Sequence, residues 1–68
     1  MKKYKILSPI VLSFIYENNQ HSVSIDNGMI ECDGKTIWYV DGANRYESIT
    51  MANLIGYALE RETIKEVQ

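Results

Sequence analysis

Residues 27–42, NGMIECDGKTIWYVDG, decide the fold of this chain. The stretch contains one Asn-Gly pair and two Asp-Gly pairs, which supply the positive φ angles that tight hairpin turns need. Short runs rich in Ile, Val, Trp and Tyr lie between the pairs, and such residues favour strands. The pattern therefore predicts a β-meander.

Pairing across these turns can be derived from the sequence, and Asn18-Asn19 adds a fourth turn upstream. If each pair forms a two-residue loop, cross-strand partners are fixed and must share a face. Ile30 is then expected opposite both Ile25 and Ile37, and Leu12 opposite Ile25. The register after Asp41-Gly42 stays open, because a longer loop also fits there. The predicted apolar face comprises Leu12, Phe14, Tyr16, Val23, Ile25, Ile30, Cys32, Ile37 and Tyr39. The opposite face is mostly polar, with five apolar exceptions: Val11, Ile15, Met29, Trp38 and Val40.

One helix is predicted from about Met51 to Glu62, with the Thr50 hydroxyl as its N-cap. Its apolar stripe should face the sheet and comprises Met51, Leu54, Ile55, Ala58 and Leu59. Residues 63–67 alternate and suit a short edge strand, whereas residues 1–9 form either an edge strand or a loosely attached basic arm. We therefore expect a single α+β domain over residues 1–68, a short-stranded antiparallel β-meander with one C-terminal helix packed on one face.

Length and charge limit the function classes. The chain has 68 residues and a formal net charge of -2, and a sequence pI of about 5.2. A domain this small has a thin core, so a partner or a second copy would be a natural source of extra burial. The acidic balance argues against duplex nucleic acid as a partner.

The apolar start of the chain is broken by Ser8, Pro9 and Ser13, and no cleavage site follows, so we expect no signal peptide. No stretch approaches the roughly 18 apolar residues of a membrane span. Cys32 is the only cysteine, which excludes an internal disulfide and suits a reducing compartment. The expected location is the cytoplasm, with no membrane partner.

No motif specifies a chemistry, so we expect no catalytic residue, no cofactor and no metal site. Gly34-Lys35-Thr36 resembles the end of a phosphate-binding loop, but Met29 stands where that motif needs glycine and strands flank it on both sides. His21 lacks further ligands at metal spacing and is interpreted as a hairpin partner of Tyr16. Cys32 falls on the apolar face, where a free cysteine behaves as a small hydrophobe.

Trp38 is the one feature that suggests a function. In the predicted register it faces away from the helix, with Met29 and Arg45 on the neighbouring strands, and Val40 and Ile15 extend the patch. Trp, Met and Arg are enriched at protein interfaces. Two other interpretations stay open: the segment around Ile6 and Leu7 covers the ring, or a shifted register places it in the core.

The sequence therefore favours a small non-catalytic protein-binding module (an inhibitor, adaptor or subunit) that acts through the surface around Trp38 or through an exposed strand edge. Its partner would be another protein or a second copy of the chain. Small domains of this kind are common among phage and mobile-element proteins, although no residue here indicates that origin. The alternative is weak single-stranded nucleic-acid binding, with Trp38, Tyr39 and Tyr46 stacking on bases and Arg45, Lys35 and the N-terminal lysines contacting phosphates.

Overall fold

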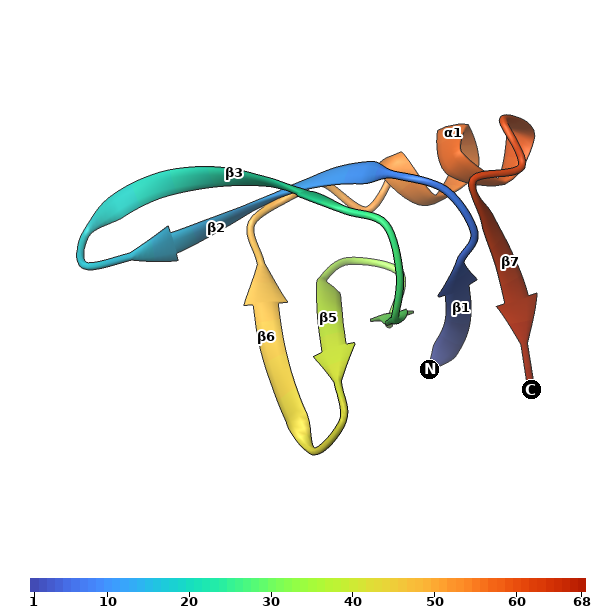
Figure 1. Cartoon of the computed structure of the whole chain (residues 1–68), viewed down its shortest axis with the longest axis horizontal. Helices are drawn as coiled ribbons and strands as arrows, with labels where there is room; N and C mark the ends of the chain where they lie inside the picture. Colours follow the sequence, from blue (N-terminus) through green and yellow to red (C-terminus); the bar gives the residue numbers. More distant parts are fainter.

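A computed structural model describes residues 1–68 as seven strands and one helix. The elements are β1 (Lys2–Ile6), β2 (Ile10–Tyr16), β3 (Asn19–Ile25), β4 (Met29–Cys32), β5 (Ile37–Asp41), β6 (Asn44–Ser48), α1 (Leu54–Glu60) and β7 (Ile64–Val67). Five strands form one sheet in the order β6-β5-β4-β1-β7, and β2 and β3 form a separate hairpin. All strand pairs are antiparallel (Figure 1). The predicted α+β class, with a meander-like antiparallel sheet and one C-terminal helix, is confirmed.

The predicted hairpin at Asn27-Gly28 is wrong, because β3 and β4 do not pair. The expected partner of Ile30 on this side was Ile25, but β4 pairs with β1, so that Tyr4 lies opposite Ile30. Gly28 does have a positive φ of 97°, and its carbonyl accepts a 3.0 Å hydrogen bond from the Ile6 N–H. The turn at Asn27-Gly28 therefore connects β3 of the hairpin to β4 of the sheet without pairing them. The side of β4 that β3 was expected to occupy is taken by β1.

Two other turns are shifted, but the shifts preserve the faces. Glu17 and Asn18 have φ angles of 51° and 65°, so the turn lies one residue earlier and Leu12 pairs with Val23 instead of Ile25. At the next hairpin Ile30 pairs with Tyr39 instead of Ile37. Each shift moves the partner by two residues, and a period of two leaves each side chain on its predicted face.

The loop between β4 and β5 is longer than predicted because Asp33 caps it. One Asp33 carboxylate oxygen accepts the N–H of Lys35 at 2.9 Å and that of Thr36 at 2.8 Å. These hydrogen bonds lower the pKa of Asp33, the bond from Thr36 contributing most. Side-chain capping of this kind favours a wider loop over a two-residue turn.

Strand β1 is neither a loose arm nor an edge strand. It pairs with β4 on one side and with β7 on the other. Its alternate residues Tyr4 and Ile6 are buried, whereas Lys3 and Lys5 are exposed. The predicted edge strand near the C-terminus is present as β7. Of the two terminal segments that could have been edge strands, only the C-terminal one, β7, lies at an edge of the sheet.

The helix is shorter than predicted, running from Leu54 to Glu60 with Asn53 at the N-cap and no side-chain cap bond. Thr50 does not cap it; its hydroxyl accepts the N–H of Ser13 at 2.9 Å instead. Ile55 and Ala58 are buried, but Leu59 is 39% exposed and Met51 74% exposed. The predicted stripe is therefore too wide at both ends.

The core lies between the five-stranded sheet and the layer formed by the hairpin and the helix, which run along the same side of it (Figure 1). Eleven buried hydrophobic residues form it: Tyr4, Ile6, Ile10, Leu12, Ile25, Ile30, Cys32, Ile37, Ile55, Ala58 and Ile64. Leu12, Ile30 and Ile37 are fully enclosed. The hairpin and α1 thus cover the same face of the sheet.

Candidate protein-interaction surface

The other face of the five-stranded sheet, called here the open face, has no element over it, because both remaining elements pack on the covered face. Strand register fixes its membership, since side chains directly opposite one another share a face. The open face comprises Lys3, Lys5, Met29, Glu31, Trp38, Val40, Arg45, Glu47, Lys65 and Val67. Its apolar members Met29, Trp38, Val40 and Val67 are each half-buried.

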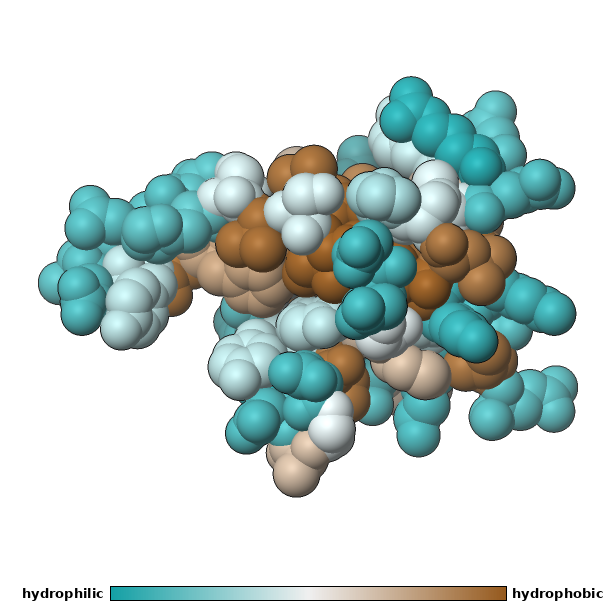
Figure 2. Space-filling view, viewed as in Figure 1, coloured by the Kyte–Doolittle hydropathy of each residue, from teal (hydrophilic) through white to brown (hydrophobic).

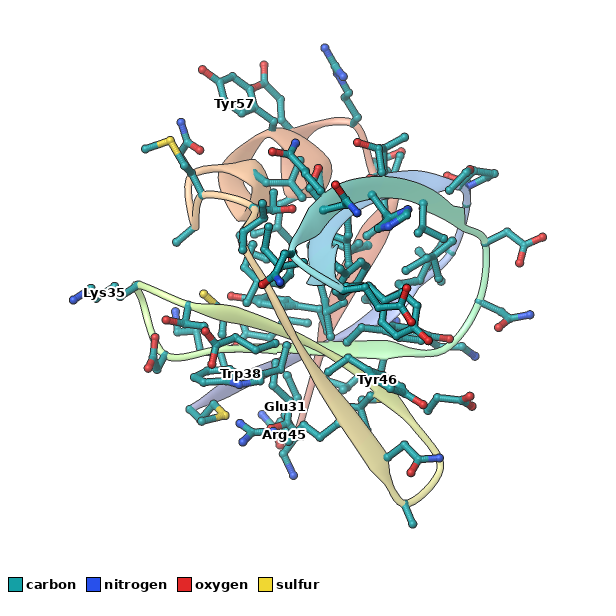
Figure 3. The ribbon with its side chains drawn as sticks, turned by 90° about the vertical axis from the view of Figure 1, so that its left-hand side faces the viewer. Glu31, Lys35, Trp38, Arg45, Tyr46 and Tyr57 are labelled. Atoms are coloured by element: carbon teal, nitrogen blue, oxygen red, sulfur yellow. The ribbon has the colours of Figure 1, made fainter.

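Three side chains of the open face form a compact cluster, which we call the Trp38 cluster: Trp38, Arg45 and Glu31. The guanidinium carbon of Arg45 lies 4.2 Å from the centroid of the Trp38 ring. A guanidinium nitrogen of Arg45 also lies 3.1 Å from a carboxylate oxygen of Glu31. Figure 3 shows the three side chains gathered on one side of the strands. Arg45 is thus held by a cation–π contact and by an ion pair.

Four of the five predicted surface residues share this face. Val40 is two residues from Trp38 on β5, with Met29 opposite it on β4 and Arg45 opposite it on β6. Met29 and Arg45 are therefore diagonal neighbours of Trp38. Ile15 does not belong with them. It lies on β2 in the hairpin, because the unpaired β3 and β4 put the hairpin in the other layer. The segment around Ile6 and Leu7 does not cover the ring, because Ile6 is buried in the core on the covered face and Leu7 lies beyond the end of β1, 51% exposed.

The open face is positively charged in an acidic protein. It carries Lys3, Lys5, Lys65 and Arg45 against Glu31 and Glu47, which gives 4 − 2 = +2. The whole chain has a formal net charge of -2. The three lysines lie on β1 and β7, beside the apolar centre of the face. Such an uneven distribution favours ligands with negative charge on this side of the molecule.

A second feature is a groove of about 640 Å³ between the hairpin and the sheet, next to the edge strand β6. Its apolar lining comes from both layers: Phe14, Ile15, Tyr16, Val23, Ile25, Tyr39 and Tyr46. The Tyr39 and Tyr46 rings are stacked, with centroids 6.3 Å apart. Figure 2 shows a band of hydrophobic residues beneath the hairpin. Burial, followed by the charge of Asp41, raises the pKa of Tyr39, so its phenol stays neutral well above neutral pH.

A polar junction around Ser13 lies next to the groove, since Ser13 and Ser48 directly adjoin the lining residues Phe14 and Glu47 in the sequence. The Ser13 carbonyl accepts the Ile49 N–H at 2.9 Å and the Ser48 hydroxyl at 2.8 Å, and the Ser48 hydroxyl also lies 2.8 Å from that of Thr50. Beyond this junction β2 and β6 diverge (Figure 1). Sequence reasoning missed the groove, although Ile15, an apolar residue on the mostly polar face of the hairpin, was a signal that this strand borders a second apolar surface.

The other candidate residues do not assemble into a site. Gly34-Lys35-Thr36 lies in the loop between β4 and β5, with no helix after it. The His21 ring meets the Tyr16 ring edge-on, with centroids 6.1 Å apart. Cys32 is buried and accepts the Gly34 N–H on its sulfur at 3.4 Å. No three His, Cys, Asp or Glu side chains gather closely enough to hold a metal ion.

The single helix spans seven residues, too few to cross a membrane. Comparison with protein-family models, with curated proteins and with solved structures finds no match to this chain.

Proposed function

We propose that this chain is a non-catalytic protein-binding module whose contact surface is the open face around Trp38. The observation that carries the proposal is the Trp38 cluster: a half-buried tryptophan, held by Arg45 at 4.2 Å, on a sheet face that no other element covers. Hot spots of protein interfaces are enriched in Trp and Arg and are surrounded by contacts that exclude water.

The geometry of the cluster supports binding because its side chains are already ordered. The Arg45 side chain is 43% exposed and that of Glu31 18% exposed, so their ion pair is accessible from solvent yet fixed by Trp38. A side chain held before binding loses less conformational entropy when the partner arrives. Strands also present the cluster more rigidly than loops would.

Charge supports an acidic partner. The formal charge of +2 on the open face, concentrated on Lys3, Lys5 and Lys65, opposes the net charge of the whole chain. A partner with an apolar centre flanked by Asp and Glu would bury the Trp38 ring and meet the lysines at the rim, where charges mainly accelerate association. A free thiol at Cys32 agrees with the cytoplasm as the place of action.

The test is affinity capture with the immobilised protein, its Trp38→Ala variant and a control, Tyr57→Ala. Tyr57 is 57% exposed and lies on the helix, on the opposite side of the molecule (Figure 3). Truncating an interface tryptophan weakens binding by about 2 kcal/mol or more, roughly thirtyfold. We expect Trp38→Ala to fold and lose the captured protein, and Tyr57→Ala to retain it. Equal capture by both variants contradicts the proposal.

The second candidate is single-stranded nucleic acid, favoured by one observation: Trp38 shares its face with Lys3, Lys5 and Lys65. Tyr39 and Tyr46 do not join Trp38 in stacking, because they line the groove on the other side. Titration of a short oligonucleotide, followed by quenching of Trp38 fluorescence, tests this candidate. Quenching that weakens steeply with salt supports it, and unchanged fluorescence contradicts it.

A further inference from the structure

Strand β6 is a free edge of the five-stranded sheet. The turn at Gly42-Ala43 has two residues, so Asp41 and Asn44 are its closing pair. Hydrogen-bonded and non-hydrogen-bonded pairs then alternate along the ladder, and the N–H and C=O groups of Arg45 and Glu47 turn away from β5. No backbone bond outside the regular ladders involves either residue. The edge therefore offers four unpaired backbone groups, two donors and two acceptors.

The same alternation shows which backbone groups of β2 point away from β3. Tyr16 and Asn19 close its hairpin, so Ser13 and Ile15 turn their backbone groups away from β3. Those of Ser13 bond Ile49 and Thr50, whereas no bond outside the ladders is formed by Ile15. Past the Ser13 junction the unpaired edges of β2 and β6 thus flank the apolar groove.

We infer that β6 pairs with β6 of a second copy of this chain, antiparallel, around a two-fold axis through Tyr46. This inference goes beyond the proposed function, because it assigns a different surface and a defined partner. In this register Arg45 lies opposite Glu47 of the second copy, and Glu47 opposite its Arg45. Both positions carry outward backbone groups, so the pairing forms four backbone hydrogen bonds.

Charge selects this register over its neighbours. Moving the axis to Arg45 places two guanidinium groups opposite each other, and moving it to Glu47 places two carboxylates opposite each other. Directly opposed like charges destabilise a strand pair, whereas opposite charges stabilise it. The order Arg45-Tyr46-Glu47 is therefore self-complementary around its central residue, as an isologous two-fold interface requires.

The groove gives the second strand an apolar surface to cover. Across the axis the two Tyr46 side chains form a non-hydrogen-bonded pair, the closer of the two pair types. Each Tyr46 already stacks on Tyr39, so four tyrosines would line up across the interface between the two copies. Ile15 is 55% exposed, Tyr16 65% and Val23 43%, and this projecting part of the hairpin lies beside the paired strands. Their burial adds to the small area that five-residue strands bury alone.

The test is sedimentation equilibrium from micromolar to millimolar concentration, with two charge reversals. Arg45→Glu sets carboxylates against carboxylates in the homodimer, and Glu47→Arg sets guanidinium groups against guanidinium groups. Each variant alone should dimerise about tenfold more weakly than the natural sequence. An equimolar mixture of the two should recover the affinity, because every opposed pair in the heterodimer is then Glu with Arg.

Lys35→Glu is the control, since it changes the net charge as Arg45→Glu does but lies in the exposed loop between β4 and β5. It should dimerise like the natural sequence. A natural sequence that stays monomeric at millimolar concentration overturns the inference, as does a mixture that fails to recover. Equal weakening by Lys35→Glu also overturns it, because general repulsion would then explain the effect.

A second measurement does not depend on any variant. In an equal mixture of isotope-labelled and unlabelled protein, the inferred register requires intermolecular contacts between the α protons of Tyr46 in the two copies. Dimers whose contacts lie elsewhere contradict the register. Self-pairing is measured with the mixture of charge-reversed variants, whereas the proposed binding surface is measured by capture with Trp38→Ala, so failure of one is distinguishable from failure of the other.

Discussion

The covered and the open face of the five-stranded sheet alternate along the same strands, yet they differ in chemistry. Ile30 and Glu31 are neighbours on β4, and Ile37 and Trp38 are neighbours on β5. Ile30 and Ile37 are fully buried, whereas Glu31 and Trp38 meet Arg45 at the surface. Burial thus concentrates the stabilising contacts on one face of the sheet, and under the proposed function recognition would belong to the other face, one residue away along each strand.

The strongest test of this division is Ile30→Ala. A fully buried isoleucine leaves a cavity when truncated, and the loss of unfolding free energy should be about 2–5 kcal/mol. Val40→Ala on the open face removes a half-buried side chain and should cost distinctly less. Urea denaturation of both variants measures the contrast. Equal losses would show that the open face also acts as core.

Gly28→Ala probes how tightly the covered face is packed. Gly28 and Gly34 have similar φ angles of 97° and 95°, so alanine strains both by roughly 1–3 kcal/mol. A Cβ on Gly28 would in addition lie 3.0 Å from two atoms of the Tyr39 ring and hydroxyl, whereas one on Gly34 meets nothing within 4 Å. Gly28→Ala should therefore be less stable than Gly34→Ala by about 1 kcal/mol in thermal melts.

Ser48→Ala tests whether the polar junction holds the hairpin over the covered face. Ser48 is 3% exposed, and its hydroxyl donates to Ser13 and accepts the Thr50 N–H at 3.1 Å. Leaving these groups unpaired should cost about 1–3 kcal/mol. Ser22→Ala is the control, because its hydroxyl contact with Ser13 is exposed. Hydrogen exchange in β2 should rise only in the first variant.

The smallest effect is expected from Arg45→Ala on the open face. Its side chain is 43% exposed, and partly exposed ion pairs and cation–π contacts each stabilise a fold by about 1 kcal/mol or less. Urea denaturation should therefore show a minor change, while Trp38 fluorescence shifts as the ring loses its cover. A loss as large as that of Ile30→Ala would remove the distinction between the faces.

Sequence alone separated the faces of the strands and predicted three of their pairings, β2 with β3, β4 with β5 and β5 with β6, but it did not predict the exact registers or the pairings of β1. A period of two survives a shift of two residues, which is why Ile30 and Tyr39 lie on the expected side in an unexpected register. Pairing of β1 with β4 brings Tyr4 opposite Ile30, 30 − 4 = 26 residues away in the sequence, and no local turn signal encodes it. Leu59→Ala, judged from the helical stripe alone, should cost 2–5 kcal/mol if buried; at 39% exposure the expected loss is smaller.

The predicted surface residues lie where expected only when the strands that carry them pair as predicted. Met29, Trp38, Val40 and Arg45 belong to strands whose relative order was expected, so they share a face as predicted. Ile15 depended on the wrong pairing of β3 with β4 and falls in the groove instead. The groove lies between the hairpin and the sheet, and the sequence pattern does not show how these two layers are placed relative to each other.

The position of β1 between β4 and β7 also determines how the chain reaches this fold. Tyr4 pairs with Glu66, so the sheet closes between residues separated by nearly the whole chain. Contacts of such sequence separation require loop closure before they contribute stability, which slows folding relative to a helical domain of equal length. A folding species in which β7 has not yet paired would leave one edge of β1 unpaired, and exposed strand edges of this kind favour aggregation.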